Sequence, residues 1–194
     1  MIYQLIGLTL FASGFIHIWE RTSWLDDRIV RSIQGALGRK PYLKRFEEVW
    51  LFGRTSFTLV VLILLTGYDW KLGLIALGVF GLTAGLEKAV KGTLDRSRPF
   101  LVHQEVEMLQ PRKPDDPSFP SGDALRIWFL VLILPIALGD SLLFGMLSIT
   151  LAVLVSLGRI VLGVHYITDV LSGAGLGFLG AGTTIWLWHS MQLI

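Results

Sequence analysis

Three short segments, far apart along the chain, hold the side chains best suited to phosphate chemistry. They supply three cations, a serine-glycine turn, and a histidine with a nearby carboxylate. These residues are Lys91 and Arg98 in KGTLDRSRP, Ser121, Gly122 and Asp123 in FPSGDA, and Arg159, His165 and Asp169 in GRIVLGVHYITD. Cations and helix N-termini stabilise phosphoryl oxygens, and an imidazole can act as a nucleophile. The combination predicts a phosphate-binding site.

His165 and Asp169 are four residues apart, so on a helix they share one face. A carboxylate in that position can hold an imidazole in one tautomer and stabilise its cation. The other ring nitrogen is then free to attack. The pair therefore predicts a nucleophile and the group that orients it.

Ser121 and Gly122 follow a proline and open an apolar segment. A serine there is expected to cap a helix, and the helix N-terminus attracts anions. Arg159 ends the apolar run LAVLVSLG, where an ionisable side chain is costly and usually functional. Both features favour a phosphate site over ordinary surface contacts.

The motifs K-x6-R-P, P-S-G and R-x5-H-x3-D, over about residues 91 to 169, resemble the three-part signature of the type 2 phosphatidic acid phosphatase superfamily. The resemblance implies that His165 forms a phosphohistidine and that Asp169 orients it. It also implies that no metal or other cofactor is needed. The phosphoryl oxygens would be bound by Lys91, Arg98, Arg159, Ser121 and the backbone of Gly122.

The sequence departs from this pattern at Gly158, where the family usually has serine, and at Asp123. Asp123 stands where the family usually has the histidine that protonates the leaving group. An aspartate of ordinary pKa, about 3.9, is protonated only about one part in a thousand at neutral pH. Asp123 is thus a buried acid with a raised pKa, an ion-pair partner of Arg126, or a sign that the leaving group needs no proton. The third alternative favours a lipid diphosphate substrate of the polyprenyl type, because a lipid monophosphate is a good leaving group.

The composition places this site in a membrane. Of 194 residues, 53% are hydrophobic and 16% are charged, and the mean hydropathy is +0.62. Six apolar segments approach the length needed to cross a bilayer, and each must be helical there. They cover about residues 2–19, 49–68, 70–91, 122–139, 141–162 and 166–189. We expect one all-α domain, residues 1–194, forming an integral membrane bundle of six transmembrane helices.

Two polar segments separate these apolar runs. Residues 20–48 predict an amphipathic helix on the membrane surface, broken at Gly38 and Pro41. Residues 92–120 form a polar loop with five of the seven prolines. An even number of spans puts both termini on one side and the three motifs on the other.

The location of the site relative to the cell stays open. The two polar segments carry most of the 17 Lys and Arg residues, which favours a cytoplasmic face. The resemblance favours the extracytoplasmic face of the cell membrane, and phosphate-binding cations distort the charge rule. A net charge of +2 does not suggest nucleic acid, and the absence of cysteine excludes thiolate chemistry.

We expect a membrane lipid phosphatase that acts on a lipid diphosphate or lipid phosphate, with membrane lipids as its other partners. The alternatives are a phosphatidylglycerophosphate or phosphatidate phosphatase, a lipid phosphotransferase, and a non-catalytic lipid-phosphate binding protein. The sequence does not separate hydrolysis from phosphotransfer, and it does not predict an oligomeric state.

Overall fold

The computed structural model describes residues 1–18, 20–37, 44–139 and 141–194, and every element in these ranges is a helix. Each of the six predicted apolar segments overlaps one helix of the bundle, so the all-helical prediction is confirmed. The predicted break at Gly38 and Pro41 lies outside the described residues. The elements are α1 (Ile2–Gly14), η1 (Phe15–Ile18), α2 (Glu20–Leu37), α3 (Lys44–Trp50), η3 (Leu51–Gly53), α4 (Thr55–Tyr68), α5 (Trp70–Leu94), α6 (Pro99–Val102), α7 (Gly122–Leu138), α8 (Leu142–Val161) and α9 (Ile167–Ser190).

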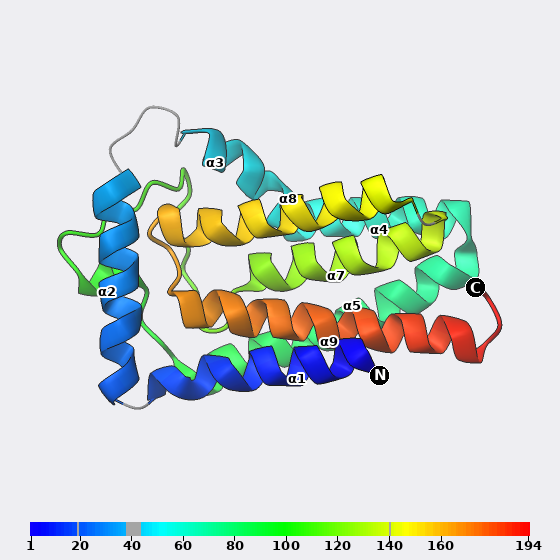
Figure 1. Cartoon of the computed structure of the whole chain (residues 1–194), viewed down its shortest axis with the longest axis horizontal. Coiled ribbons are helices and arrows are strands. Elements are labelled where there is room, and N and C mark those ends of the chain that lie inside the picture. Colours follow the sequence, from blue (N-terminus) through cyan, green and yellow to red (C-terminus); the bar gives the residue numbers. More distant parts are fainter. Residues whose placement is uncertain (19, 38–43, 140) are drawn as a thin grey trace.

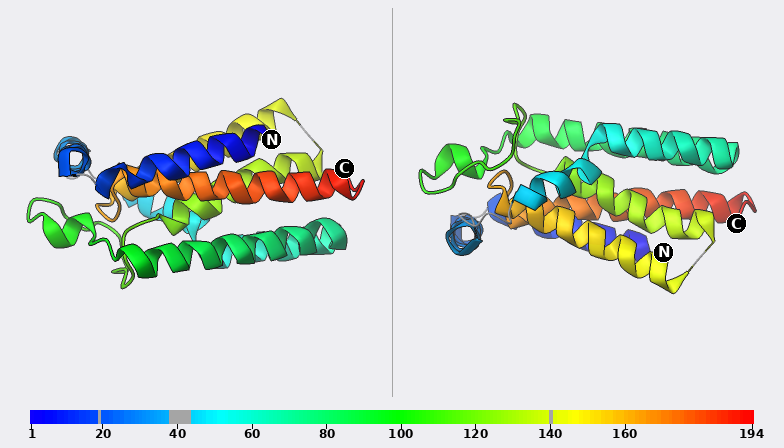
Figure 2. Two further views of the ribbon diagram at one scale, coloured as in Figure 1. Left: turned by 90° about the horizontal axis from the view of Figure 1, so that it is seen from below. Right: turned by 90° about the horizontal axis from the view of Figure 1, so that it is seen from above.

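The long helices form an elongated bundle, and α2 lies across one end of it (Figure 1). Figure 2 shows the same arrangement from two further sides, with both chain termini toward the end opposite α2. Among the described residues, three segments are long and apolar enough to cross a membrane: Trp70–Val102, α8 and α9. Large apolar side chains such as Leu82 and Leu142 point outward and are about four-fifths exposed. The chain is an integral membrane protein.

Side-chain caps begin three of the bundle helices. Asp69 accepts hydrogen bonds from the backbone N–H groups of Lys71 and Leu72 at the start of α5. Ser121 accepts one from Ala124 at the start of α7, and Ser141 caps α8 in the same way. Such caps satisfy amide groups that the helix itself leaves free. Since α7 and α9 begin at the end of the bundle where α5 and α8 finish, the three sequence motifs meet there.

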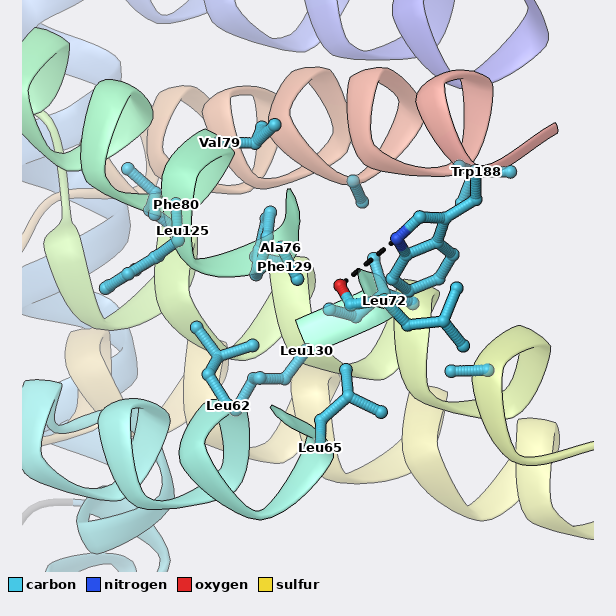
Figure 3. Close-up of a cluster of buried hydrophobic side chains, with 14 of the residues drawn as sticks. Leu62, Leu65, Leu72, Ala76, Val79, Phe80, Leu125, Phe129, Leu130 and Trp188 are labelled. Atoms are coloured by element: carbon cyan, nitrogen blue, oxygen red, sulfur yellow. Dashed lines mark hydrogen bonds between the residues drawn. The ribbon is translucent and has the colours of Figure 1, made fainter. Parts of the chain in front are cut away.

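Helix α9 is central and packs against both α1 and α7. Its glycines permit the close approach: a Cβ atom at Gly177 would lie 2.6 Å from the backbone oxygen of Leu125 in α7. Further along, the buried indole of Trp188 donates a hydrogen bond to the backbone oxygen of Leu72 in α5, at 3.2 Å. Figure 3 shows Trp188 beside apolar side chains of α4, α5 and α7. This apolar core holds the helices that carry the site.

The turn between α8 and α9 depends on Gly163, whose φ of +73° is in the left-handed region. A Cβ atom there would lie 2.6 Å from the side-chain nitrogen of Gln34 in α2. Gln34 also bonds to the backbone of Glu107 and Val161, which ties α2 to the polar loop and to α8. The turn that carries His165 is therefore held from three sides.

Candidate active site

A cavity of about 180 Å³ opens at the end of the bundle nearest α2, between the ends of α5, α7 and α8 and the polar loop. Six of the eight predicted site residues line it, which brings together motifs that are far apart in the sequence. These are Lys91, Arg98, Gly122, Asp123, Arg159 and His165. The other two, Ser121 and Asp169, are fully buried behind the cavity wall.

His165 lies in the connection between α8 and α9 and is 2% exposed. Its Nε2 atom is 3.2 Å from Nη1 of Arg98. Because a guanidinium group can only donate, Nε2 accepts this hydrogen bond and Nδ1 carries the proton. Nδ1 is 3.4 Å from the hydroxyl of Ser118 and 3.5 Å from Oδ2 of Asp169. The predicted pairing of His165 with Asp169 is present, and the unprotonated nitrogen, Nε2, faces Arg98.

Burial, with the nearby cations Arg98 and Arg159, lowers the pKa of His165 from 6.5 to about 3, and Asp169 opposes the shift. The imidazole is therefore neutral at physiological pH. A neutral imidazole keeps the lone pair that nucleophilic attack requires.

Asp169 has no exposed surface and is held by donors on both oxygens. Oδ2 accepts hydrogen bonds from the hydroxyl of Ser118 at 2.6 Å and from the backbone N–H of Tyr166 at 2.9 Å. Oδ1 accepts one from Arg96 at 2.5 Å. Ser118 and Arg96 were missed by the sequence reasoning, although both lie within or beside the motifs. Only their position next to the motif residues could have pointed to them.

Lys91 and Arg98 are not free for an anion, because a carboxylate of the polar loop lies between them. Asp116 forms an ion pair with Lys91, and its Oδ1 is 2.7 Å from Nη2 of Arg98. Burial opposes the charge on Asp116, but the hydrogen bonds and charges of the two cations outweigh burial and hold its pKa at about 2. Lys91 also pairs with Glu87, at 3.2 Å. The sequence reasoning did not anticipate either carboxylate.

Asp123 is also bound by two cations. Its Oδ1 is 2.8 Å from Nη2 of Arg126, which is the ion pair that the sequence offered as one alternative. Its Oδ2 is 3.0 Å from Nε of Arg159, although at an angle that makes no hydrogen bond, and accepts one from the indole of Trp50 at 3.2 Å. Two guanidinium partners favour the ionised form of a carboxylate. Asp123 is thus arranged as an ion-pair partner.

The serine-glycine turn has a structural task at this site. The Ser121 hydroxyl caps α7, and the Ser121 N–H donates to the backbone oxygen of Asp169, which joins two motifs. A Cβ atom at Gly122 would collide with the carboxylate of Glu87 and lie 2.8 Å from Nη1 of Arg126. A larger residue at position 122 would therefore displace the ends of the Glu87 and Arg126 side chains.

The chain belongs to the PAP2 superfamily, whose model matches residues 72–193. This is the family that the sequence motifs resemble, so that prediction is confirmed. The chain is 31% identical over 198 residues to phosphatidylglycerophosphatase B of Bacillus subtilis, covering 91% of each protein. It is 32% identical over 131 residues to undecaprenyl-diphosphatase of Sulfolobus acidocaldarius, covering 68% of this chain and 59% of the relative.

Two solved structures share the fold. A transmembrane PAP2 type phosphatidylglycerolphosphate phosphatase from Bacillus subtilis matches with a TM-score of 0.83, 23% identity and 98% coverage of both chains. Aquifex aeolicus LpxE matches with a TM-score of 0.71 and 24% identity, over 82% of this chain and 93% of that one. At these identities the likeness is one of fold.

Replacing Arg98 by Gln should raise the pKa of His165, since a cation 3.2 Å from Nε2 disfavours the imidazolium. Activity that requires the neutral imidazole then disappears at a higher pH, so the acidic limb of kcat/KM moves upward by about one pH unit or more. The pH profile of lipid phosphate hydrolysis measures this shift. Arg126→Gln is the matched control, because Arg126 lines the same cavity and binds Asp123 instead of the imidazole. Equal shifts of the acidic limb in the two variants would contradict the assignment of Arg98 as the cation that acts on His165.

Proposed function

We propose that this protein is a membrane lipid phosphatase that removes the terminal phosphate of a lipid phosphate or diphosphate through a phosphohistidine at His165. The observation that carries the proposal is the buried imidazole of His165, backed by Asp169 and facing a cavity lined by cations. Membership of the PAP2 superfamily and the phosphatase names of the relatives support it.

In the proposed mechanism, Nε2 of His165 attacks the phosphorus and the bond to the leaving oxygen breaks. Asp169 stabilises the imidazolium that forms, as a carboxylate does for a catalytic histidine. Water then attacks the phosphohistidine, which releases inorganic phosphate and restores the imidazole. Lys91, Arg98 and Arg159 stabilise the charge on the transferring group.

Substrate binding requires an exchange of anions. The cations at the cavity are paired with carboxylates, and Asp116 is the most accessible of these, with a side chain 46% exposed. Asp123 is held between two guanidinium groups at the start of α7 and cannot move as freely. We infer that the substrate phosphate takes the place of Asp116 between Lys91 and Arg98.

The ion pairs of Asp123 bear on the choice of substrate. A carboxylate held as an anion is a poor proton donor, so it favours a leaving group that needs no proton. A lipid diphosphate provides one, because its leaving group is itself a phosphate. The likeness to phosphatidylglycerophosphatase B favours a monoester instead. We propose a diphosphate preference, with the monoester as the second candidate.

The arrangement of the helices supports a six-span disposition, with both termini on one side of the membrane and the cavity at the other. The resemblance to the family supports a site on the extracytoplasmic face of the cell membrane. Here α2 would lie along the membrane surface beside the cavity, as Figure 1 suggests from its orientation across the bundle.

His165→Ala should abolish phosphate release, by a factor on the order of 10³ or more, because the variant lacks the imidazole that forms the proposed covalent intermediate. Purified protein in detergent is assayed with phosphatidate, phosphatidylglycerophosphate and a polyprenyl diphosphate, with and without EDTA. His103→Ala is the control, since that histidine pairs with Asp27 in α2 and lies outside the cavity lining given above. Hydrolysis retained by the His165 variant would contradict the mechanism, and binding without hydrolysis by the wild type would favour the non-catalytic alternative.

Asp116→Asn should lower KM and the inhibition constant of inorganic phosphate by up to about fivefold, because a partly exposed ion pair contributes up to about 1 kcal/mol. The value of kcat should not fall. The neighbouring Asp115→Asn is the matched control, as Asp115 also lines the cavity. If Asp116 instead serves to place Arg98, kcat drops in the Asp116 variant and phosphate binding does not tighten.

Asp123→Asn should reduce diphosphate hydrolysis only modestly if Asp123 is not the acid. Asp123→His should raise monoester hydrolysis more than diphosphate hydrolysis, because only an alkoxide leaving group needs the proton. Both variants are measured on a lipid monophosphate and a diphosphate with the same lipid chain. Equal losses of about 100-fold or more on the two substrates, the size expected for a general acid, would show that Asp123 donates the proton.

A further inference from the structure

Arg96 lies between Lys91 and Arg98 in the sequence, but its side chain serves a different purpose. It is absent from the described cavity lining, and its guanidinium group binds two buried carboxylates. Nη1 is 2.5 Å from Oδ1 of Asp169, and Nη2 is 2.7 Å from Oδ2 of Asp26 in α2. The side chain of Arg96 is 12% exposed, and those of Asp169 and Asp26 are 0% and 1% exposed. An arginine fork can reach two acceptors at once, as a lysine cannot.

Two further contacts fix the guanidinium group. Nη1 of Arg96 also donates to the hydroxyl of Thr168 at 2.8 Å, and that hydroxyl binds Asp26 in turn. The ring of Tyr166, the residue next to His165, lies 4.0 Å from the guanidinium carbon of Arg96. Arg96 is thus held from several sides and has one well-defined position.

The main chain of Arg96 supports the same group by a second route. Its carbonyl oxygen accepts a hydrogen bond from the N–H of Ser118 at 2.8 Å. The Ser118 hydroxyl then donates to Oδ2 of Asp169 and lies near Nδ1 of His165. Hydrogen bonds to both oxygens of Asp169 therefore depend on where Arg96 lies.

We propose that Arg96 is a positioning residue for the nucleophile, and that Asp26 makes helix α2 part of the catalytic centre by holding Arg96. The proposal rests on the function proposed for His165 and Asp169. A buried carboxylate without a cation is costly, by several kcal/mol, and it favours the protonated form of a neighbouring imidazole. Arg96 neutralises Asp169, so that Asp169 orients His165 without keeping it protonated.

Helix α2 fits this role because of where its side chains lie. Asp26 points into the protein, while its neighbours Trp24 and Leu25 are about half exposed. Asp27, the next residue, is turned to a different partner and binds His103 in the polar loop through Oδ1 at 2.9 Å. Two adjacent carboxylates thus join α2 to the rest of the protein, and Asp26 is the one that binds Arg96, the partner of Asp169.

The test compares Arg96→Gln, Arg96→Lys, Asp26→Asn and Asp27→Asn in the full chain, with a lipid monophosphate in detergent micelles. Arg96→Gln should lower kcat by roughly tenfold to a hundredfold, the usual effect of losing a partner that orients a reactive group, with little change in KM. His165 also faces Arg98, Arg159 and Ser118, which all variants keep. Arg96→Gln removes the cation that neutralises Asp169, so the imidazole of His165 gains a proton more readily. The acidic limb of the pH profile of kcat then moves to higher pH. Arg96→Lys should keep the limb near its wild-type position and recover part of kcat.

Asp26→Asn should lower kcat several-fold at unchanged KM, and Asp27→Asn should leave both unchanged. Thermal unfolding in detergent identifies the variants that fold. If Arg96→Gln does not fold, Arg96→Lys and Asp26→Asn test the positioning role instead. Equal effects of the two α2 variants, or an Arg96 effect confined to KM or to unfolding, overturn the positioning role. His165→Ala is run alongside: activity in that variant defeats the proposed function itself, whereas an inactive His165→Ala with a wild-type-like Asp26→Asn defeats only this inference.

Discussion

The structure depends on pairing charges that lie at the ends of apolar helices. Helices α5, α7 and α8 and the segment that follows α5 bring a lysine and several arginines to one end of the bundle, where an isolated buried ion would be costly. Carboxylates from other elements meet them: Asp116 of the loop, Asp123 of α7 and Asp26 of α2. These ion pairs fix the helix ends relative to one another. The interactions that stabilise the buried charges therefore also shape the cavity.

The same ion pairing gives His165 two different environments, one on the cavity side and one on the buried side. On the cavity side, Asp116 is partly exposed and can give way to another anion. On the far side of His165, Asp169 is fully enclosed by Ser118, Tyr166 and Arg96 and has no freedom to move. Under the proposed function, Asp116 gives way to the substrate anion while Asp169 keeps His165 aligned. Burial keeps the imidazole between them neutral.

By the resemblance, Asp123 stands where the family usually has a histidine, and we propose that this change alters the chemistry of a shared fold. Its place at the start of α7 puts it beside the cavity, but the guanidinium groups of Arg126 and Arg159 hold both of its oxygens. The PAP2 fold is retained with TM-scores of 0.83 and 0.71 to its solved neighbours. The helices pack through apolar and glycine residues, so their packing does not depend on the residue at position 123. Proteins with similar backbones can therefore differ at this position.

Apolar segment lengths and the spacing of a few reactive residues were enough to predict an all-helical membrane protein of this family and six residues that line the cavity. Hydrophobicity and helix periodicity are local properties, so they can be read along the chain. The partners of the site residues could not be predicted from the sequence. Asp26 and Arg96 are 70 positions apart, and Asp116 is one of several charged residues in a polar loop. Which carboxylate meets which cation is decided only when the helices pack, because burial makes each unpaired charge costly and leaves few arrangements that satisfy them all.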